Sequence, residues 1–177
     1  AWAGEIARMA GVRPVGLTPK RRPAALIDPP AGPADDAWPM VVDAEESFYV
    51  KPDAGKLLIS PADATPSAPC DAQPEELDVA IAVDRVEQAF DLSVRRIAHK
   101  WAGLRSFVAD GEPVAGYAPD AEGFFWLVGQ GGYGIQTAPA VGQLAAALVV
   151  GDAMPEGFAD AGVDPAGLAP DRPGLAA

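Results

Sequence analysis

The strand-like stretch Phe124-Phe125-Trp126-Leu127-Val128, the segment Gly129-Gln130-Gly131-Gly132-Tyr133-Gly134-Ile135-Gln136-Thr137 and the alanine-rich run from Ala138 to Val150 decide the fold. Together they predict a strand, a glycine loop and a helix. The glycines at 129, 131 and 134 satisfy the spacing G-x-G-x-x-G, in which missing Cβ atoms let the backbone approach a ligand beside a helix N-terminus. The simpler alternative is a glycine-bearing turn between a core strand and a core helix.

A dinucleotide-binding fold requires more than this spacing. It needs a second parallel strand after the helix, with an acidic residue near its end. Asp152 lies at a tolerable distance, but Ala153–Phe158 and the tail to Ala177 contain no β-branched run. We therefore expect the loop to hold an anionic or acceptor-rich edge of a ligand whose phosphates are bound elsewhere.

Composition restricts the function classes. The 177 residues accommodate one domain with a substantial core, and 13 basic against 25 acidic side chains give a net charge of −12. That balance argues against a general nucleic-acid or anionic-membrane surface. No run approaches the roughly 18 apolar residues of a membrane span. Cys70 is the only cysteine, so no intrachain disulfide is expected.

Patterning along the chain predicts an α+β arrangement with a mostly antiparallel sheet, a covering helix and a C-terminal helix. Ala1–Gly11 is expected to be a short amphipathic helix, and such a start looks like a cut made inside a larger protein. A second helix is expected to begin at Pro74-Glu75-Glu76 and to end near Phe90. The segment 61–74 is expected to be a loop. Strands are expected at residues 14–28, 38–43, 47–51, 56–60 and 92–108.

Arg105 is the most informative charged residue. Period-two alternation places it on one strand face with Trp101 and Phe107, and a guanidinium among aromatic side chains must be paired or bound to an anion. A structural Arg–Asp pair is the alternative. His99 is expected on the strand surface. With one cysteine, one histidine and no nucleophile elbow, neither metal ligation nor acid–base catalysis is expected, which leaves binding of a cofactor and a small anion.

Four ordered motifs resemble the C-terminal half of the D-amino-acid dehydrogenase/oxidase flavoprotein family, which includes glycine oxidase, and within it the bacterial D-arginine dehydrogenases. The resemblance covers Ala1 to about Val150. The motifs are Leu17-Thr18-Pro19-Lys20-Arg21-Arg22, Ser47-Phe48-Tyr49-Val50-Lys51-Pro52-Asp53, Trp101-Ala102-Gly103-Leu104-Arg105-Ser106-Phe107 and the segment 129–137.

The resemblance implies a two-domain flavoenzyme that binds FAD, of which this chain is a C-terminal fragment without the N-terminal FAD domain of Rossmann type. Residues 1–13 would end the FAD-domain portion and 14–118 would form a substrate-binding sheet domain. Residues 119–151 would return through the glycine loop to a helix that docks on the absent domain, and 152–177 would form a C-terminal tail.

The resemblance also implies site residues, with roles in orientation and none in acid–base catalysis. Arg22, Tyr49 and Arg105 would contact the substrate carboxylate, while Met40, Val42 and Gly132 would line the substrate pocket. The residues expected against the flavin are Gly131, Gly132, Tyr133, Gly134, Ile135, Gln136 and Thr137.

The implied reaction is oxidation of a D-amino acid by hydride transfer to flavin, which gives an imino acid and then a 2-oxo acid. The fragment alone would be inactive. The implied location is the cytoplasm, free or at the inner-membrane surface. Two other functions are open: a free-standing module that binds a carboxylate ligand without flavin, and a non-catalytic subunit that completes an FAD site in a partner chain.

Overall fold

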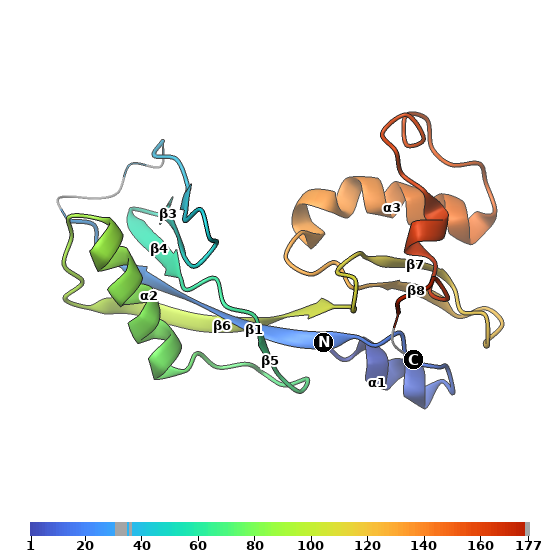
Figure 1. Cartoon of the computed structure of the whole chain (residues 1–177), viewed down its shortest axis with the longest axis horizontal. Coiled ribbons are helices and arrows are strands. Elements are labelled where there is room, and N and C mark those ends of the chain that lie inside the picture. The colour runs from blue at the N-terminus through green and yellow to red at the C-terminus, as the bar shows by residue number, and fades with distance from the viewer. Residues whose placement is uncertain (31–34, 36, 176–177) are drawn as a thin grey trace. The chain divides into compact units, whose positions relative to one another are not determined.

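The computed structural model describes residues 1–30, 35 and 37–175, which form two compact units. One unit comprises Ala1–Pro19 with Arg105–Ala177, and the other comprises Lys20–Leu104. The length favoured a single domain, whereas the buried apolar side chains form two separate clusters, one in each unit. Figure 1 labels the elements, and each unit is described by itself below.

The unit of residues 20–104 contains most of a six-stranded sheet. Its strands are β1 (Thr18–Ile27), β2 (Val41–Val42), β3 (Tyr49–Asp53), β4 (Lys56–Ser60), β5 (Thr65–Pro66) and β6 (Ile97–Phe107). The order is β2-β3-β4-β1-β5, and β6 also pairs with β1. The pairs β1–β4, β1–β5, β2–β3 and β3–β4 are antiparallel, which confirms the expected mostly antiparallel sheet.

Helix α2 (Glu76–Ala89) covers one face of this sheet, as Figure 1 shows. Its buried side chains, Val79, Ala82 and Val86, recur at intervals of three and four residues and pack on the sheet residues Ile27 and Ile59. Proline precedes the helix, and acidic residues occupy its first turn, where their negative charge interacts favourably with the positive end of the helix dipole. The predicted covering helix is thus confirmed.

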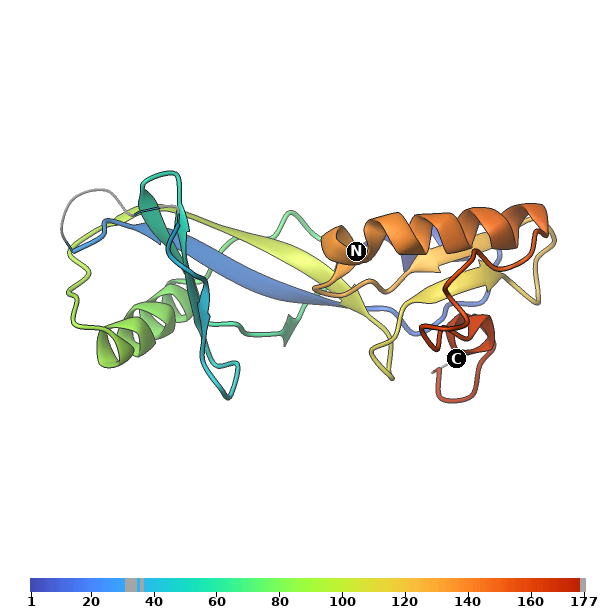
Figure 2. The same ribbon diagram turned by 90° about the horizontal axis from the view of Figure 1, so that it is seen from above.

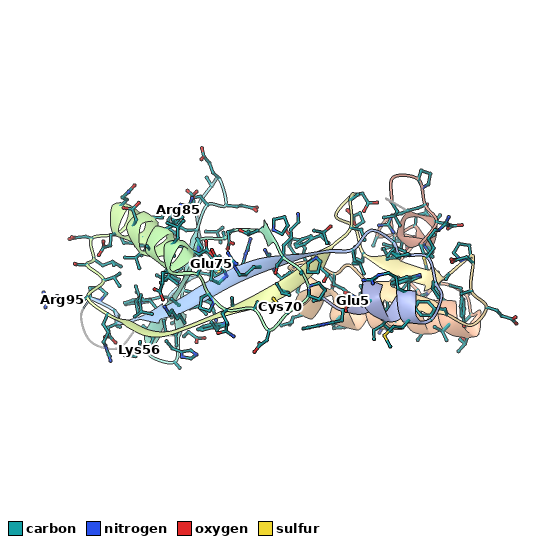
Figure 3. All side chains as sticks on the ribbon, turned by 90° about the horizontal axis from the view of Figure 1, so that it is seen from below. Glu5, Lys56, Cys70, Glu75, Arg85 and Arg95 are labelled. Atoms are coloured by element: carbon teal, nitrogen blue, oxygen red, sulfur yellow. The ribbon has the colours of Figure 1, made fainter. Side chains whose placement is uncertain are left out.

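Polar contacts hold α2 against the sheet. Figure 3 labels two of the residues that make them, Glu75 at the start of the helix and Arg85 in its third turn. Glu75 accepts a hydrogen bond from Arg21 of β1. The guanidinium of Arg85 donates to the carbonyl oxygens of Ser47 and, at 3.1 Å, Pro61. The predicted loop 61–74 differs in one place, because β5 pairs with β1 there.

The other unit is built on an antiparallel hairpin of β7 (Val114–Tyr117) and β8 (Phe125–Val128). Helix α1 (Ala3–Met9) lies on one side of the hairpin and α3 (Gly134–Val150) on the other (Figures 1 and 2). Val114 and Trp126 are buried with Ala7 in one apolar cluster. The predicted tail, residues 152–177, contains the short 3-10 helix η1 (Pro165–Leu168); residues 176–177 lie outside the described residues.

Candidate functional site

The glycine loop connects β8 to α3. Gly129 and Gly131 have φ of 78° and 54°, conformations that other residues adopt only with strain. The N–H of Gly131 donates to the carbonyl oxygen of Ser106 at 3.0 Å, and the N–H of Tyr133 donates to that of Gln130, also at 3.0 Å. The loop is therefore folded against the end of β6 and held there by a backbone hydrogen bond.

Gly131 lies directly on the ring of Phe107. A Cβ added at Gly131 would be 2.5 Å from Cε1 and 2.9 Å from Cδ1 of that ring, distances that real Cβ atoms essentially never show. Two independent constraints, backbone conformation and the nearby ring, therefore require glycine at this position. Gly129 is close to the β6–β7 turn, since an added Cβ would be 3.7 Å from Cα of Pro113.

Arg105 completes this cluster. Its guanidinium carbon is 5.3 Å from the ring centroid of Phe107, a distance at which a cation interacts favourably with an aromatic face. A Cβ added at Gly132 would be 3.0 Å from Nη1 of Arg105. The half-buried guanidinium is thus placed between an aromatic ring and a loop position without a side chain. The expectation that Arg105 lies among aromatic residues is confirmed for Phe107.

Helix α3 begins at Gly134, four residues before the alanine-rich segment expected to be helical. The N–H of Thr137 and its hydroxyl both donate to the carbonyl oxygen of Tyr133, at 3.0 and 2.9 Å, and this closes the first turn. Residues 134–137, expected in the loop, are therefore the first helical turn. No side chain caps this N-terminus, where Tyr133 is 61% and Ile135 97% exposed.

These features fit an anionic or acceptor-rich ligand edge. The first N–H groups of a helix have no acceptor within the helix, and the helix dipole favours negative charge at that end. The glycines at 131, 132 and 134 let the backbone here lie close to Phe107, Arg105 and Gln130. The predicted FAD-contacting segment 131–137 forms one continuous surface within its unit.

The other predicted substrate residues belong to the sheet unit. Val42 is paired with Tyr49, so both side chains are on the same sheet face, and Met40 precedes Val42 by two positions. Arg21 reaches Asp78 of α2, which places the adjacent Arg22 on the opposite face of β1. The face away from α2 therefore carries the expected side chains of this unit, with Met40 and Val42 each 51% exposed.

Arg22 makes contacts that the sequence did not reveal. Its Nε donates to the carbonyl oxygen of Asp63 at 2.8 Å, and its Nη2 donates to that of Ala62. Ala62 has a φ of 53°, so this arginine fastens a strained turn after β4. Its expected contact with a carboxylate stays a prediction.

The turn before Tyr49 is fixed by Asp43. The carboxylate of Asp43 accepts hydrogen bonds from the Ser47 hydroxyl at 2.6 Å and the Ser47 N–H at 3.2 Å. These bonds favour the ionised form and hold the pKa of Asp43 below its ordinary value. The turn that Asp43 closes lies between β2 and β3, next to the pair formed by Val42 and Tyr49.

Sequence reasoning found Arg105 but assigned no role to Phe107. The signal was available, because the two residues are two positions apart on one strand and therefore share a face. The contact with Gly131 was not accessible, since it joins positions far apart in the sequence. His99 is exposed, as expected, and stacks on Trp101 with ring centroids 5.5 Å apart.

Metal and membrane features are also informative. Within residues 1–30, 35 and 37–175, no three His, Cys, Asp or Glu side chains gather as metal ligands would. In the same part of the chain, no helix has the length and apolarity needed to cross a bilayer. Cys70 is exposed, with its Sγ 3.7 Å from Oγ of Ser67.

Curated relatives are similar to this chain over most of its length. The FAD-dependent oxidoreductase domain-containing protein 1 of Bos taurus is 26% identical over 166 residues, which cover 85% of this chain and 34% of the relative. The protein of the same name from Xenopus laevis is 25% identical, over 85% of this chain and 33% of its own. This chain spans about a third of the length of the curated relatives it matches.

Solved structures share the fold. Glycine oxidase from Geobacillus kaustophilus has a TM-score of 0.68 at 23% identity and covers 90% of this chain and 42% of its own. Iminodiacetate oxidase from Chelativorans has a TM-score of 0.70 at 20% identity, over 89% and 42% of the two chains. L-proline dehydrogenase from P. horikoshii has a TM-score of 0.69 at 22% identity, over 88% and 42%.

The family model described as "DAO: FAD dependent oxidoreductase" matches residues 1–148. That range includes both units' predicted site residues and ends near the C-terminus of α3. The α+β fold with antiparallel sheets agrees with the solved structures of similar fold. The chain belongs to the DAO family of FAD-dependent oxidoreductases.

Proposed function

We propose that this chain is the substrate-binding and flavin-contacting part of an enzyme that oxidises D-amino acids, with D-arginine dehydrogenase as the nearest activity. The observation that carries the proposal is the cluster of Arg105, Phe107 and Gly131–Gly132 beside an uncapped helix N-terminus. It combines a cation suited to a carboxylate with exposed backbone suited to the acceptor-rich edge of a flavin.

The cofactor assignment is supported by the loop itself. Segment 131–137 would lie against FAD, because no side chain caps the start of α3 and that end of the helix favours negative charge. When FAD is bound, it would supply the two-electron acceptor for the hydride that leaves the substrate α-carbon. The remaining pyrophosphate and adenine contacts would come from a domain of Rossmann type outside residues 1–177.

The substrate assignment rests on Arg105. Its planar fork matches a carboxylate, and Gly132 lies close to its Nη1, 3.0 Å from a Cβ added at that glycine. Within the sheet unit, the proposal keeps Tyr49 and Arg22 as residues that contact substrate, and Met40 and Val42 as residues that line its pocket. The role of these residues is orientation: a fixed carboxylate directs the α C–H towards the acceptor.

Proteins of similar fold support an amine-bearing carboxylate as the substrate class. They include a glycine oxidase, an L-amino acid deaminase and an L-proline dehydrogenase. Because L-specific enzymes are among them, preference for the D enantiomer needs its own test. D- and L-arginine, and D- and L-alanine, offered to the protein of the complete reading frame would provide it; faster turnover of both L forms would contradict the D assignment.

The decisive variant is Arg105→Met, made in the full-length protein and compared with Arg8→Met. Arg8 is an exposed arginine that pairs only loosely with Glu5, at 3.8 Å. Loss of a guanidinium that binds a carboxylate costs about 2–5 kcal/mol, so kcat/KM should fall by at least about 100-fold, mainly through KM. FAD content should be retained. A fall below about threefold, with Arg8→Met unchanged, would refute the carboxylate role.

A further inference from the structure

The C-terminal tail follows α3 and lies beyond residues 1–148, the part of the chain matched by the family model. Within it, Arg172 is only 9% exposed although it carries a permanent charge. An arginine this deeply buried must have its charge and its N–H groups satisfied by the protein.

Arg172 makes a bidentate ion pair with Asp110. Its Nε donates to Oδ2 at 2.8 Å and its Nη2 donates to Oδ1 at 2.9 Å. The same guanidinium donates to the carbonyl oxygens of Glu112 at 2.9 Å, Pro113 at 3.1 Å and Ala169 at 3.2 Å. Apart from Ala169, every acceptor lies in the turn that joins β6 to β7.

The tail also packs along β7. A Cβ added at Gly116 would be 2.9 Å from Cδ of Pro170, so the tail backbone lies close against the strand. Leu175 packs on the apolar cluster that contains Val114 and Trp126. The ion pair is therefore the polar centre of a longer contact and fixes the register of the tail on the hairpin.

The turn held by Arg172 forms a wall of the glycine loop. An added Cβ at Gly129 would be 3.7 Å from Cα of Pro113 and 3.7 Å from the backbone nitrogen of Val114. At the other end of the loop, Gly131 is hydrogen-bonded to Ser106 and lies on Phe107, just before the same turn. Tail, turn and loop are thus in continuous contact.

We propose that Arg172 is a positioning residue for the flavin-contacting loop: by clamping the turn 110–113 through Asp110, it holds the backbone against which Gly129, at the start of the loop, packs. The inference rests on the proposed function for its effect on FAD. Its mechanical part, the coupling of the tail to the loop, depends only on contacts within one unit.

The test uses the full-length protein with Arg172→Met, and Arg8→Met as the matched control. Amide exchange of Gly131 should become about tenfold faster or more, since its hydrogen bond to Ser106 loses a supporting wall. The dissociation constant for FAD should rise about fivefold or more. Arg172→Lys, which keeps the charge and loses the fork, should give a smaller change in both quantities.

A general loss of stability predicts a different pattern. It would speed exchange uniformly, including in the β3–β4 hairpin of the other unit, whereas the proposal requires that hairpin to be unaffected. Asp110→Asn, which preserves the size of the side chain, tests the same contact if Arg172→Met fails to fold. Uniform acceleration in Asp110→Asn, or faster exchange confined to residues 165–175 with Gly131 unchanged, would overturn the proposal.

The exchange measurement also separates this inference from the proposed function. If the wild-type protein binds no FAD, the proposed function fails, while faster exchange at Gly131 in Arg172→Met would still establish the clamp. If FAD binds with equal affinity to wild type and Arg172→Met, the positioning role fails and the proposed function stands.

Discussion

Replacement of Gly131 by alanine is the sharpest perturbation of the loop. It adds one methyl group at a φ of 54°, directed at a ring atom only 2.5 Å away. Phe107 cannot move freely, because its ring also contacts the Arg105 guanidinium. Either the ring shifts, with the guanidinium, or the loop backbone leaves its position against Ser106.

The magnitude follows from three contributions. An L-residue in the left-handed region costs about 1–2 kcal/mol, and forcing a methyl group into a packed site costs about 1–3 kcal/mol. Alanine restricts the unfolded chain more than glycine does, which offsets about 0.4–1 kcal/mol. We therefore expect Gly131→Ala to lower the free energy of unfolding by about 2–3 kcal/mol.

The assay is urea unfolding of the full-length protein, followed by far-ultraviolet circular dichroism, with FAD titration of each variant. Gly103→Ala is the matched control: Gly103 is on β6, has no atom within 4 Å of an added Cβ and is exposed. This control should be neutral or stabilising by about 0.5 kcal/mol. Gly131→Ala should also weaken FAD binding, because the displaced loop presents its backbone differently.

A second substitution isolates the steric cause. In a Phe107→Leu background the flat ring is gone, so Gly131→Ala should lose about 1 kcal/mol or more of its effect, as neighbouring residues couple non-additively. If Gly131→Ala changes the free energy of unfolding by less than about 0.5 kcal/mol in the wild-type background, the packing described here is wrong. Equal effects in both backgrounds would leave backbone conformation as the sole cause.

Three further outcomes test the two units separately. Val86→Ala removes apolar volume from a fully buried site under α2 and should lower the free energy of unfolding by about 2 kcal/mol, measured by urea unfolding. Arg21→Met leaves the carboxylate of Asp78, only 14% exposed, without this cation and should cost about 2 kcal/mol in the same assay. The hydrogen bonds from Arg172 lower the pKa of Asp110 in the folded protein. Their stabilisation is therefore present above about pH 4, the ordinary pKa of an aspartate, and is lost as the pH falls through the lower folded-state pKa. The difference in unfolding free energy between wild type and Asp110→Asn should shrink over that range.

Local patterns predicted the elements well. Alternation, turn residues and a proline before an amphipathic segment give strands and a covering helix, because each depends on neighbours along the chain. The start of α3 was missed by four residues, since Gly134 and Thr137 are poor helix formers. The first turn of α3 is closed by hydrogen bonds from Thr137 to the carbonyl oxygen of Tyr133, and helix propensities do not include such contacts.

Contacts between distant positions were not predictable in the same way. Arg172 is separated from Asp110 by 62 residues, and Arg22 from the carbonyl of Asp63 by 41. Arginine next to proline and glycine resembles any solvated tail. Only the folded hairpin brings the Asp110 carboxylate and two backbone carbonyls to the guanidinium of Arg172, so the sequence alone did not indicate this contact.

The three glycines of the loop show why spacing alone could not identify the ligand. Gly129 is favoured by its positive φ and Gly131 by its φ and the Phe107 ring, while a Cβ at Gly134 would make a tight contact of 3.2 Å with the side chain of Gln130. Each reason is a contact inside this chain, and none requires a pyrophosphate. The strand before the loop pairs antiparallel with β7, in contrast to the parallel pairing of a dinucleotide fold. The same G-x-G-x-x-G spacing therefore arises from packing on β6, and Arg105 beside Gly132 gives the loop its chemical character.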